Sequence, residues 1–106
     1  MSNKKLEQQA EFLRNITRLL EFAHANKFEL VLDLAHLDTG CEFGRSVHSD
    51  GLALSFKLFG LAPDGHWDYF GLKEDHAMLG KFWKSLDTRC VWEGRTYSMP
   101  WTAVDN

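Results

Sequence analysis

The chain has 106 residues, of which 44% are apolar and 25% are charged. This length and composition are typical of a single globular domain, and they exclude a disordered or fibrous chain. The formal net charge is −3, and the 12 basic residues form no run of like charge. We therefore expect no phosphate-binding surface and no direct nucleic-acid binding.

The chain contains no sign of membrane insertion or export. No apolar run approaches the roughly 20 residues that span a bilayer, and residues 1–7 are too polar for a signal peptide. We therefore expect no membrane association and a location in the bacterial cytoplasm. Two cysteines, Cys41 and Cys90, are too few for a disulfide framework and are interpreted as free thiols, with a disulfide or a metal pair as the alternative.

Residues 3–26 are predicted to form a long amphipathic helix, because apolar residues recur at spacings of three and four. The stripe predicted to face the core consists of Leu6, Ala10, Leu13, Ile16, Leu20 and Ala23, widened by Phe12, Leu19 and Phe22. The opposite face is predicted to be solvated and carries Glu7, Gln8, Glu11, Arg14 and Arg18.

Short strands are predicted where apolar and polar residues alternate or β-forming residues cluster, and their ranges are 28–35, 52–59, 66–70, 90–92 and 96–99. Turns are predicted at residues 63–65, which read Pro-Asp-Gly, and at residues 93–95. Pro100 confines the last strand to an edge or an end of a sheet.

A second helix is predicted over residues 73–86, with a buried face made of Leu79, Phe82, Trp83 and Leu86. Its start, Glu74-Asp75-His76, is expected to be solvated. The resulting fold class is α+β, with two helices packed on a small, mostly antiparallel sheet. We expect one domain over residues 1–106, in which residues 102–106 form a frayed tail.

Residues 46–55 read Ser-Val-His-Ser-Asp-Gly-Leu-Ala-Leu-Ser. This segment resembles the Ser-x-His-x-x-Gly-x-Ala-x-Asp motif of the D-Ala-D-Ala carboxypeptidase family of zinc peptidases, to which small phage endolysins belong. The matching residues are Ser46, His48, Gly51 and Ala53. In that family the His and the Asp bind zinc, so the resemblance implies that His48 is a vestigial ligand and that Ser55 replaces the Asp.

The resemblance continues through the second helix and into residues 93–98, which read Glu-Gly-Arg-Thr-Tyr-Ser. The family closes on Asp-Gly-Asn-His-Phe-Ser, in which the acid is the general base and the His is the third zinc ligand. The resemblance therefore implies that Glu93 stands at the general-base position and Thr96 at the ligand position. His36 stands where the family has its substrate-anchoring Arg. A fold of the D-Ala-D-Ala carboxypeptidase type is the corresponding expectation.

Zinc chemistry decides how this pattern is interpreted. A catalytic zinc ion keeps three protein ligands from His, Cys, Asp or Glu, together with a water molecule. With Ser55 and Thr96 at two of the three positions, His48 alone remains, and neutral hydroxyls are poor zinc ligands. We therefore expect no cofactor. The alternative, zinc in a rearranged site, would draw on Asp50, His66, Asp68, His76, Cys41 or Cys90, none of which has a tight ligand spacing.

The preferred hypothesis is a catalytically inactive, peptidase-like binding protein of phage or prophage origin. Its partner would be a host protein or protein complex, for example a defence system such as CRISPR-Cas. Trp101, Trp67 and His36 are the candidate binding residues, since Trp is enriched in binding hot spots, whereas Trp83 and Trp92 are expected to fill the core. Two alternatives remain open: a zinc-dependent peptidase that cuts peptidoglycan stem peptides with Glu93 as base, and a cell-wall-binding module.

Overall fold

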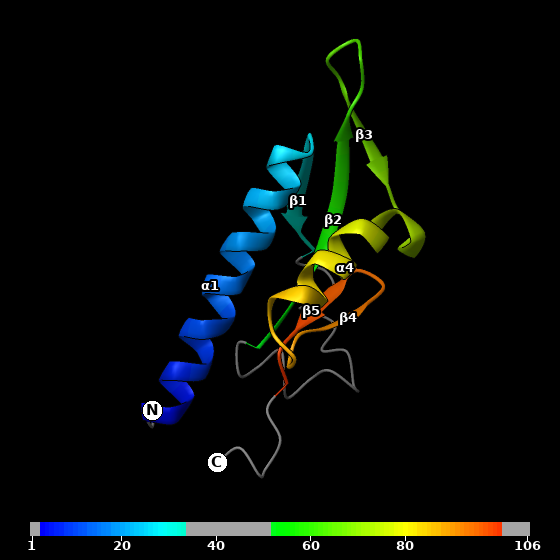
Figure 1. The fold of residues 1–106 in the computed structure, drawn as a ribbon. Helices are drawn as coiled ribbons and strands as arrows, with labels where there is room; N and C mark the ends of the chain where they lie inside the picture. Colours follow the sequence, from blue (N-terminus) through cyan, green and yellow to red (C-terminus); the bar gives the residue numbers. More distant parts are fainter. Residues whose placement is uncertain (1–2, 34–51, 101–106) are drawn as a thin grey trace.

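The computed structural model describes residues 3–33 and 52–100 of the chain. In chain order the elements are α1 (Asn3–Ala25), β1 (Phe28–Leu32), β2 (Ala53–Leu61), β3 (Trp67–Phe70), the 3-10 helix η1 (Lys73–His76), α4 (Ala77–Leu86), β4 (Val91–Glu93) and β5 (Thr96–Ser98) (Figure 1). The expectation of two helices packed on a small antiparallel sheet is confirmed.

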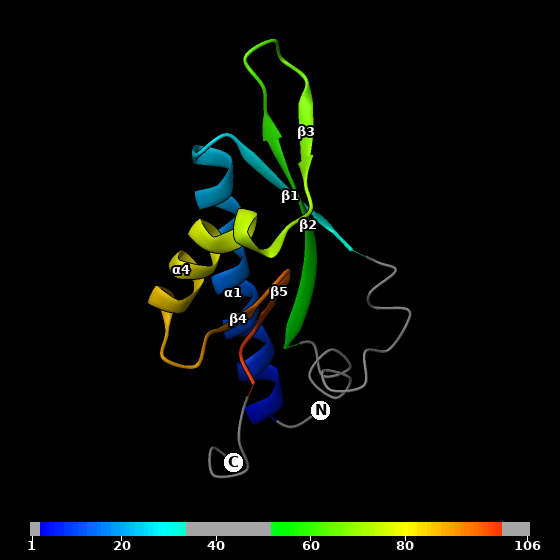
Figure 2. The ribbon, with the colours of Figure 1, turned by 90° about the vertical axis from the view of Figure 1, so that its right-hand side faces the viewer.

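The sheet is built around β2, the longest strand. Strand β1 pairs with one edge of β2, β3 and β5 pair with different stretches of the other edge, and β4 pairs with β5; every pairing is antiparallel. Both helices cover the same face of this sheet (Figure 2). The hairpin of β2 and β3 projects beyond both helices (Figure 1 and Figure 2), and residues 63–69 at its end are exposed.

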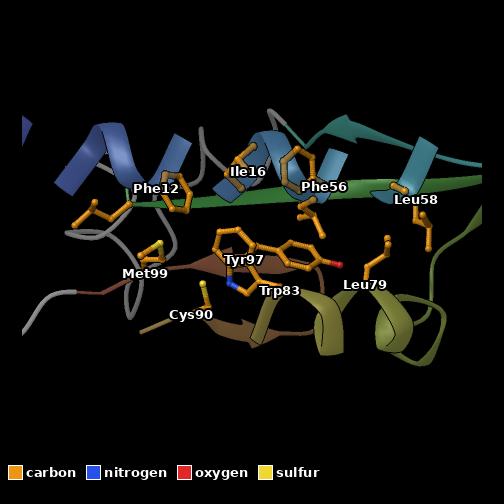
Figure 3. Packing of buried hydrophobic residues seen from close by; sticks show 12 residues of the cluster. Phe12, Ile16, Phe56, Leu58, Leu79, Trp83, Cys90, Tyr97 and Met99 are labelled. Carbon is orange, nitrogen blue, oxygen red and sulfur yellow. The ribbon is translucent and has the colours of Figure 1, made fainter. Parts of the chain in front are cut away.

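The core lies between the helices and the inner sheet face (Figure 3), and its centre is Trp83 of α4. The Trp83 ring meets Phe12 of α1 and Tyr97 of β5 edge-on, with centroid distances of 5.9 and 6.0 Å. Its indole N–H donates to the carbonyls of Val91 and Ser98 at 3.0 and 3.2 Å, so the buried polar atom is satisfied. Burying one such side chain contributes roughly 2 to 3 kcal/mol. The prediction that Trp83 is a core residue is confirmed.

The predicted buried face of α1 is wrong in part. Leu6, Leu13 and Leu20 were expected against the core, but they are 56%, 54% and 39% exposed. Phe12, Ile16, Leu19 and Ala23 are buried as predicted, and Gln8 and Asn15 complete the buried face. The helix is rotated about its axis relative to the predicted orientation, because Phe12 fills the space beside Trp83. Gln8, expected in solvent, is consequently only 8% exposed.

Several boundaries differ from those predicted from the sequence. Strand β1 ends at Leu32, and β2 begins at Ala53 and continues to Leu61. The predicted helix over residues 73–86 starts with a 3-10 turn, η1, before the α-helix begins at Ala77. The expectation of a solvated start is wrong for His76, which is 0% exposed. It is buried because its ring packs beside Tyr97.

Three further expectations concern Cys90, Trp92 and membrane insertion. Cys90 is a buried free thiol, and burial raises its pKa to about 11; its possible partner Cys41 lies outside the described residues. Trp92 is only partly buried, although it packs against the core. Within residues 3–33 and 52–100, no helix has the length and apolar character needed to cross a bilayer.

Candidate functional site

Three positions of the zinc-peptidase motif lie side by side in the sheet. Two of them are zinc-ligand positions, and the third is the general-base position. Ser55 of β2 is the cross-strand partner of Thr96 of β5, and Thr96 is also the partner of Glu93 of β4. Directly opposed residues of antiparallel strands point to the same face. The three side chains therefore start from the sheet face turned away from the helices, which we call the outer face.

A hydrogen bond joins the first two of these residues. The Ser55 and Thr96 hydroxyl oxygens are 2.7 Å apart, so one hydroxyl donates to the other. Ser55 is 1% exposed. A buried hydroxyl needs such a partner, because leaving it unpaired would cost about 1 to 3 kcal/mol. The pair is a neutral contact between two strands, in which each hydroxyl has a partner.

Asp33, the residue after β1, continues this line across the sheet. Its backbone N–H donates to the Ser55 carbonyl at 2.9 Å, which extends the β1–β2 ladder by one residue. The Asp33 carboxylate is 3.9 Å from the guanidinium of Arg95, and Arg95 also donates to the Tyr69 hydroxyl at 3.3 Å. We call Glu93, Thr96, Ser55 and Asp33 the polar row. It has a carboxylate at each end and two hydroxyls in the middle.

The sequence interpretation missed Asp33, Arg95 and Tyr69. Asp33 could have been predicted from the sequence. Side chains alternate between the two faces along a strand, so Asp33 lies on the opposite face from Leu32. Arg95 could not, since its contact with Asp33 depends on how the β4–β5 turn meets the end of β1. Its carbonyl accepts from the Phe56 N–H at 3.0 Å, which fixes the turn against β2.

A second polar pair lies on the inner face, beneath the same hairpin. His76 Nδ1 and the Tyr97 hydroxyl share a hydrogen bond of 2.8 Å. Burial, followed by the positive charge of Arg95, lowers the pKa of His76 from 6.5 to about 4, against a smaller opposing effect of Asp75. Burial also raises the pKa of Tyr97. Both groups are therefore neutral near pH 7, and the pair stabilises the core.

A surface hollow of about 410 Å³ lies beside the β4–β5 hairpin. Its lining residues are Lys73, Glu74, Ala77, Trp92, Glu93 and Gly94. Glu93 is exposed and contributes to the lining of the hollow, whereas neither Ser55 nor Thr96 lines it. The candidate base and the two candidate ligand positions share a sheet register but do not share this hollow.

The remaining sequence-predicted site residues are distributed as follows. His36, His48 and Trp101 lie outside the described residues, as do Cys41 and Asp50. Trp67 lies on the projecting β2–β3 hairpin and is 47% exposed. It is the cross-strand partner of Leu61, and Tyr69 is the partner of Phe59, so these four side chains share the outer face. Leu61 and Tyr69 are also exposed.

Within the described residues, the candidate ligands for a rearranged metal site do not lie together. His66 lies at the hairpin turn, where its ring pairs with Asp64 and, at 2.8 Å, with Asp68. His76 is buried against Tyr97, and Cys90 lies near Asn15 of α1. Among residues 3–33 and 52–100, no three His, Cys, Asp or Glu side chains form a group able to hold a metal ion.

Comparison of the chain with protein-family models, with curated proteins and with solved structures finds no match. The resemblance to the zinc peptidases therefore rests on the sequence motif alone.

Proposed function

We propose that this chain is a non-catalytic, peptidase-like binding protein of phage or prophage origin, acting in the bacterial cytoplasm through contact with a host protein or protein complex. Inhibition of a host defence system such as CRISPR-Cas is one such role. The observation that carries the proposal is the 2.7 Å hydrogen bond between the Ser55 and Thr96 hydroxyls, at two of the three positions where the resembled family binds zinc.

The residues at these positions do not fit a zinc ion. Structural and catalytic zinc sites use thiolate, imidazole or carboxylate ligands, whereas Ser55 and Thr96 supply neutral hydroxyls that are hydrogen-bonded to each other. The third motif position, His48, could contribute one imidazole, and one ligand does not fix the ion. Without a metal-bound water, a carboxylate at Glu93 has no nucleophile to activate. No catalytic step is assigned to this site.

Support for a binding role comes from the outer face of the β2–β3 hairpin. Leu61, Trp67 and Tyr69 are 42%, 47% and 51% exposed, and they lie together with Phe59. The Phe59 and Tyr69 rings are 5.4 Å apart. Clustered exposed aromatic side chains are typical of protein-interaction sites, in which Trp and Tyr supply much of the binding energy.

The proposal is tested by measuring zinc in the purified protein and in a variant with restored ligands. We expect wild type to hold no stoichiometric zinc and to cleave no peptidoglycan stem peptide when zinc is added. The double variant Ser55→Asp with Thr96→His should gain zinc affinity measurable by calorimetry, because it supplies the carboxylate and imidazole that the motif lacks.

The matched control moves the new imidazole along β5. Ser55→Asp with Ser98→His has the same added groups, but the imidazole lies two residues, or roughly 7 Å, from the motif position. It should bind zinc no better than wild type. Tight stoichiometric zinc in wild type, or chelator-sensitive cleavage, would contradict the proposal and favour a rearranged peptidase site. If the variant with Ser55→Asp and Thr96→His folds but binds no zinc, the site is placed wrongly.

A further inference from the structure

Helix α1 carries an apolar stripe that the rest of the described chain does not cover. Leu6, Leu13 and Leu20 are spaced by seven residues and are 56%, 54% and 39% exposed. Ala10 and Thr17 lie between them, so the stripe advances in steps of four and three residues. We call these five residues the leucine stripe. It lies beside the face of α1 that packs Phe12, Ile16 and Leu19 into the core.

A repeat of four and three residues is the pattern by which one helix packs along another. It keeps the apolar side chains on one narrow seam, and here large and small residues alternate along that seam. The small positions are suited to burial: the Thr17 hydroxyl already donates to the Leu13 carbonyl at 2.9 Å, which leaves its methyl group for packing. Helix α1 also runs along one side of the molecule (Figure 1), where a second helix can approach it.

We propose that the leucine stripe is a dimer interface, in which α1 packs antiparallel against α1 of a second copy of this chain. In an antiparallel pair of helices, the two seam positions of each heptad face each other. Leu13 then lies against Ala10 of the second copy, and Leu6 lies against Thr17. The two-fold axis repeats both contacts, so in each of them a large residue meets a small one and the helices can approach closely.

The charges beside the leucine stripe also favour a second copy of this chain in the antiparallel orientation. Going along α1, the acidic Glu7 follows Leu6 and the basic Arg14 follows Leu13, and both are exposed, whereas Glu11 is already paired with Arg89 at 2.6 Å. In the register that pairs Leu13 with Ala10, Glu7 of the second copy falls between Arg14 and Arg18. A parallel pairing would instead place Arg14 beside the uncharged Gln9 of the second copy, so the opposite charges would not meet. Opposite charges flanking an apolar seam select partner and orientation.

The first measurement is the mass of the purified full chain by sedimentation equilibrium, from micromolar to millimolar concentration. We expect a reversible monomer–dimer equilibrium. Leu13→Glu should abolish the dimer, because it places a carboxylate in the centre of an apolar seam, while its exposed position preserves the fold. Leu72→Glu is the matched control, since Leu72 is 66% exposed but lies before η1, away from α1; it should dimerise like wild type.

Charge reversal tests the register. Glu7→Arg and Arg14→Glu should each weaken dimerisation about tenfold, because each substitution alters two charge contacts that are related by the two-fold axis. The double variant should dimerise more tightly than either single variant. The proposal is overturned by a wild-type chain that stays monomeric throughout, by a Leu13→Glu dimer, or by single and double variants that do not differ. None of these results depends on whether the chain binds zinc or a host protein.

Discussion

His76 is a buried titratable residue that favours the neutral imidazole. It is 0% exposed, its Nδ1 is bonded to the Tyr97 hydroxyl, and its Nε2 has no hydrogen-bond partner among the described residues. Desolvation is the main reason why its pKa is lowered from 6.5 to about 4. As the pH falls, the unfolded chain therefore binds a proton at this residue before the folded chain does.

The stability of the protein should depend on pH through this residue. Because the folded pKa is the lower one, the contribution is complete above pH 6.5 and is lost as the pH falls from 6.5 to about 4. The loss is on the order of 3 kcal/mol in the free energy of unfolding. His76→Asn keeps a hydrogen-bonding group near the Nδ1 position but cannot ionise, so it should flatten this part of the profile.

Urea unfolding of both proteins between pH 7.5 and pH 4 measures the difference. His66→Asn is the control for the substitution itself, because it replaces an exposed histidine at the β2–β3 turn, outside the core. Parallel profiles for wild type and His76→Asn would contradict the role given to His76.

At the scale of elements, α4 packs closely on β4 because Gly80 leaves room for Trp92. A Cβ atom built on Gly80 would overlap the Trp92 ring. The Trp92 indole N–H donates to the Gly94 carbonyl at 2.6 Å, which holds the ring over the helix. The contact also positions the β4–β5 hairpin, and with it Glu93 and Thr96 of the polar row.

Gly80→Ala should therefore destabilise the protein, although alanine is the better helix former. The propensity gain of about 1 kcal/mol is outweighed by overpacking, which typically costs about 1 to 3 kcal/mol and displaces the hairpin. Lys81→Ala, at an exposed position of the same helix, should be neutral or slightly stabilising. Thermal unfolding of the two variants decides the point, and a melting temperature for Gly80→Ala equal to or above that of wild type would contradict it.

Helix α1 illustrates why the sequence predicts an element better than its orientation. Its period and length are evident from the chain, and the observed helix, Asn3–Ala25, agrees with the predicted range. Its apolar residues cover more than half of the circumference, so two different stripes satisfy the helical period. The choice between them depends on Trp83, which lies far away in sequence and packs against Phe12.

At the scale of the whole molecule, the two helices cover one face of the sheet, and the outer face lies opposite them (Figure 2). The polar row lies nearer the centre of this face, and the cluster of Phe59, Leu61, Trp67 and Tyr69 lies on the hairpin that projects from it. Arg95 links the two regions through Asp33 and Tyr69. The proposed partner would dock on the hairpin cluster.

Replacing Trp67 and Tyr69 together with Ala should weaken partner binding at least tenfold, because the large aromatic anchors of an interface contribute most of its affinity. The measurement is a titration of the partner that wild type captures from a bacterial host lysate. Leu72→Ala removes a comparably exposed apolar side chain outside the cluster and should bind normally. Equal affinities for all three proteins would exclude this surface.

The order of elements, the α+β class and the core role of Trp83 follow from the chain alone, because each depends on local periodicity, turn residues and side-chain volume. The motif placed Ser55 and Thr96 at two ligand positions, but their cross-strand pairing, hydrogen bond and burial required the sheet register. Tertiary structure alone decided that Leu6, Leu13 and Leu20 stay exposed, that His76 is buried and that Arg95 meets Asp33. These outcomes depend on contacts between residues far apart in sequence, and such contacts leave no periodic signal in the chain.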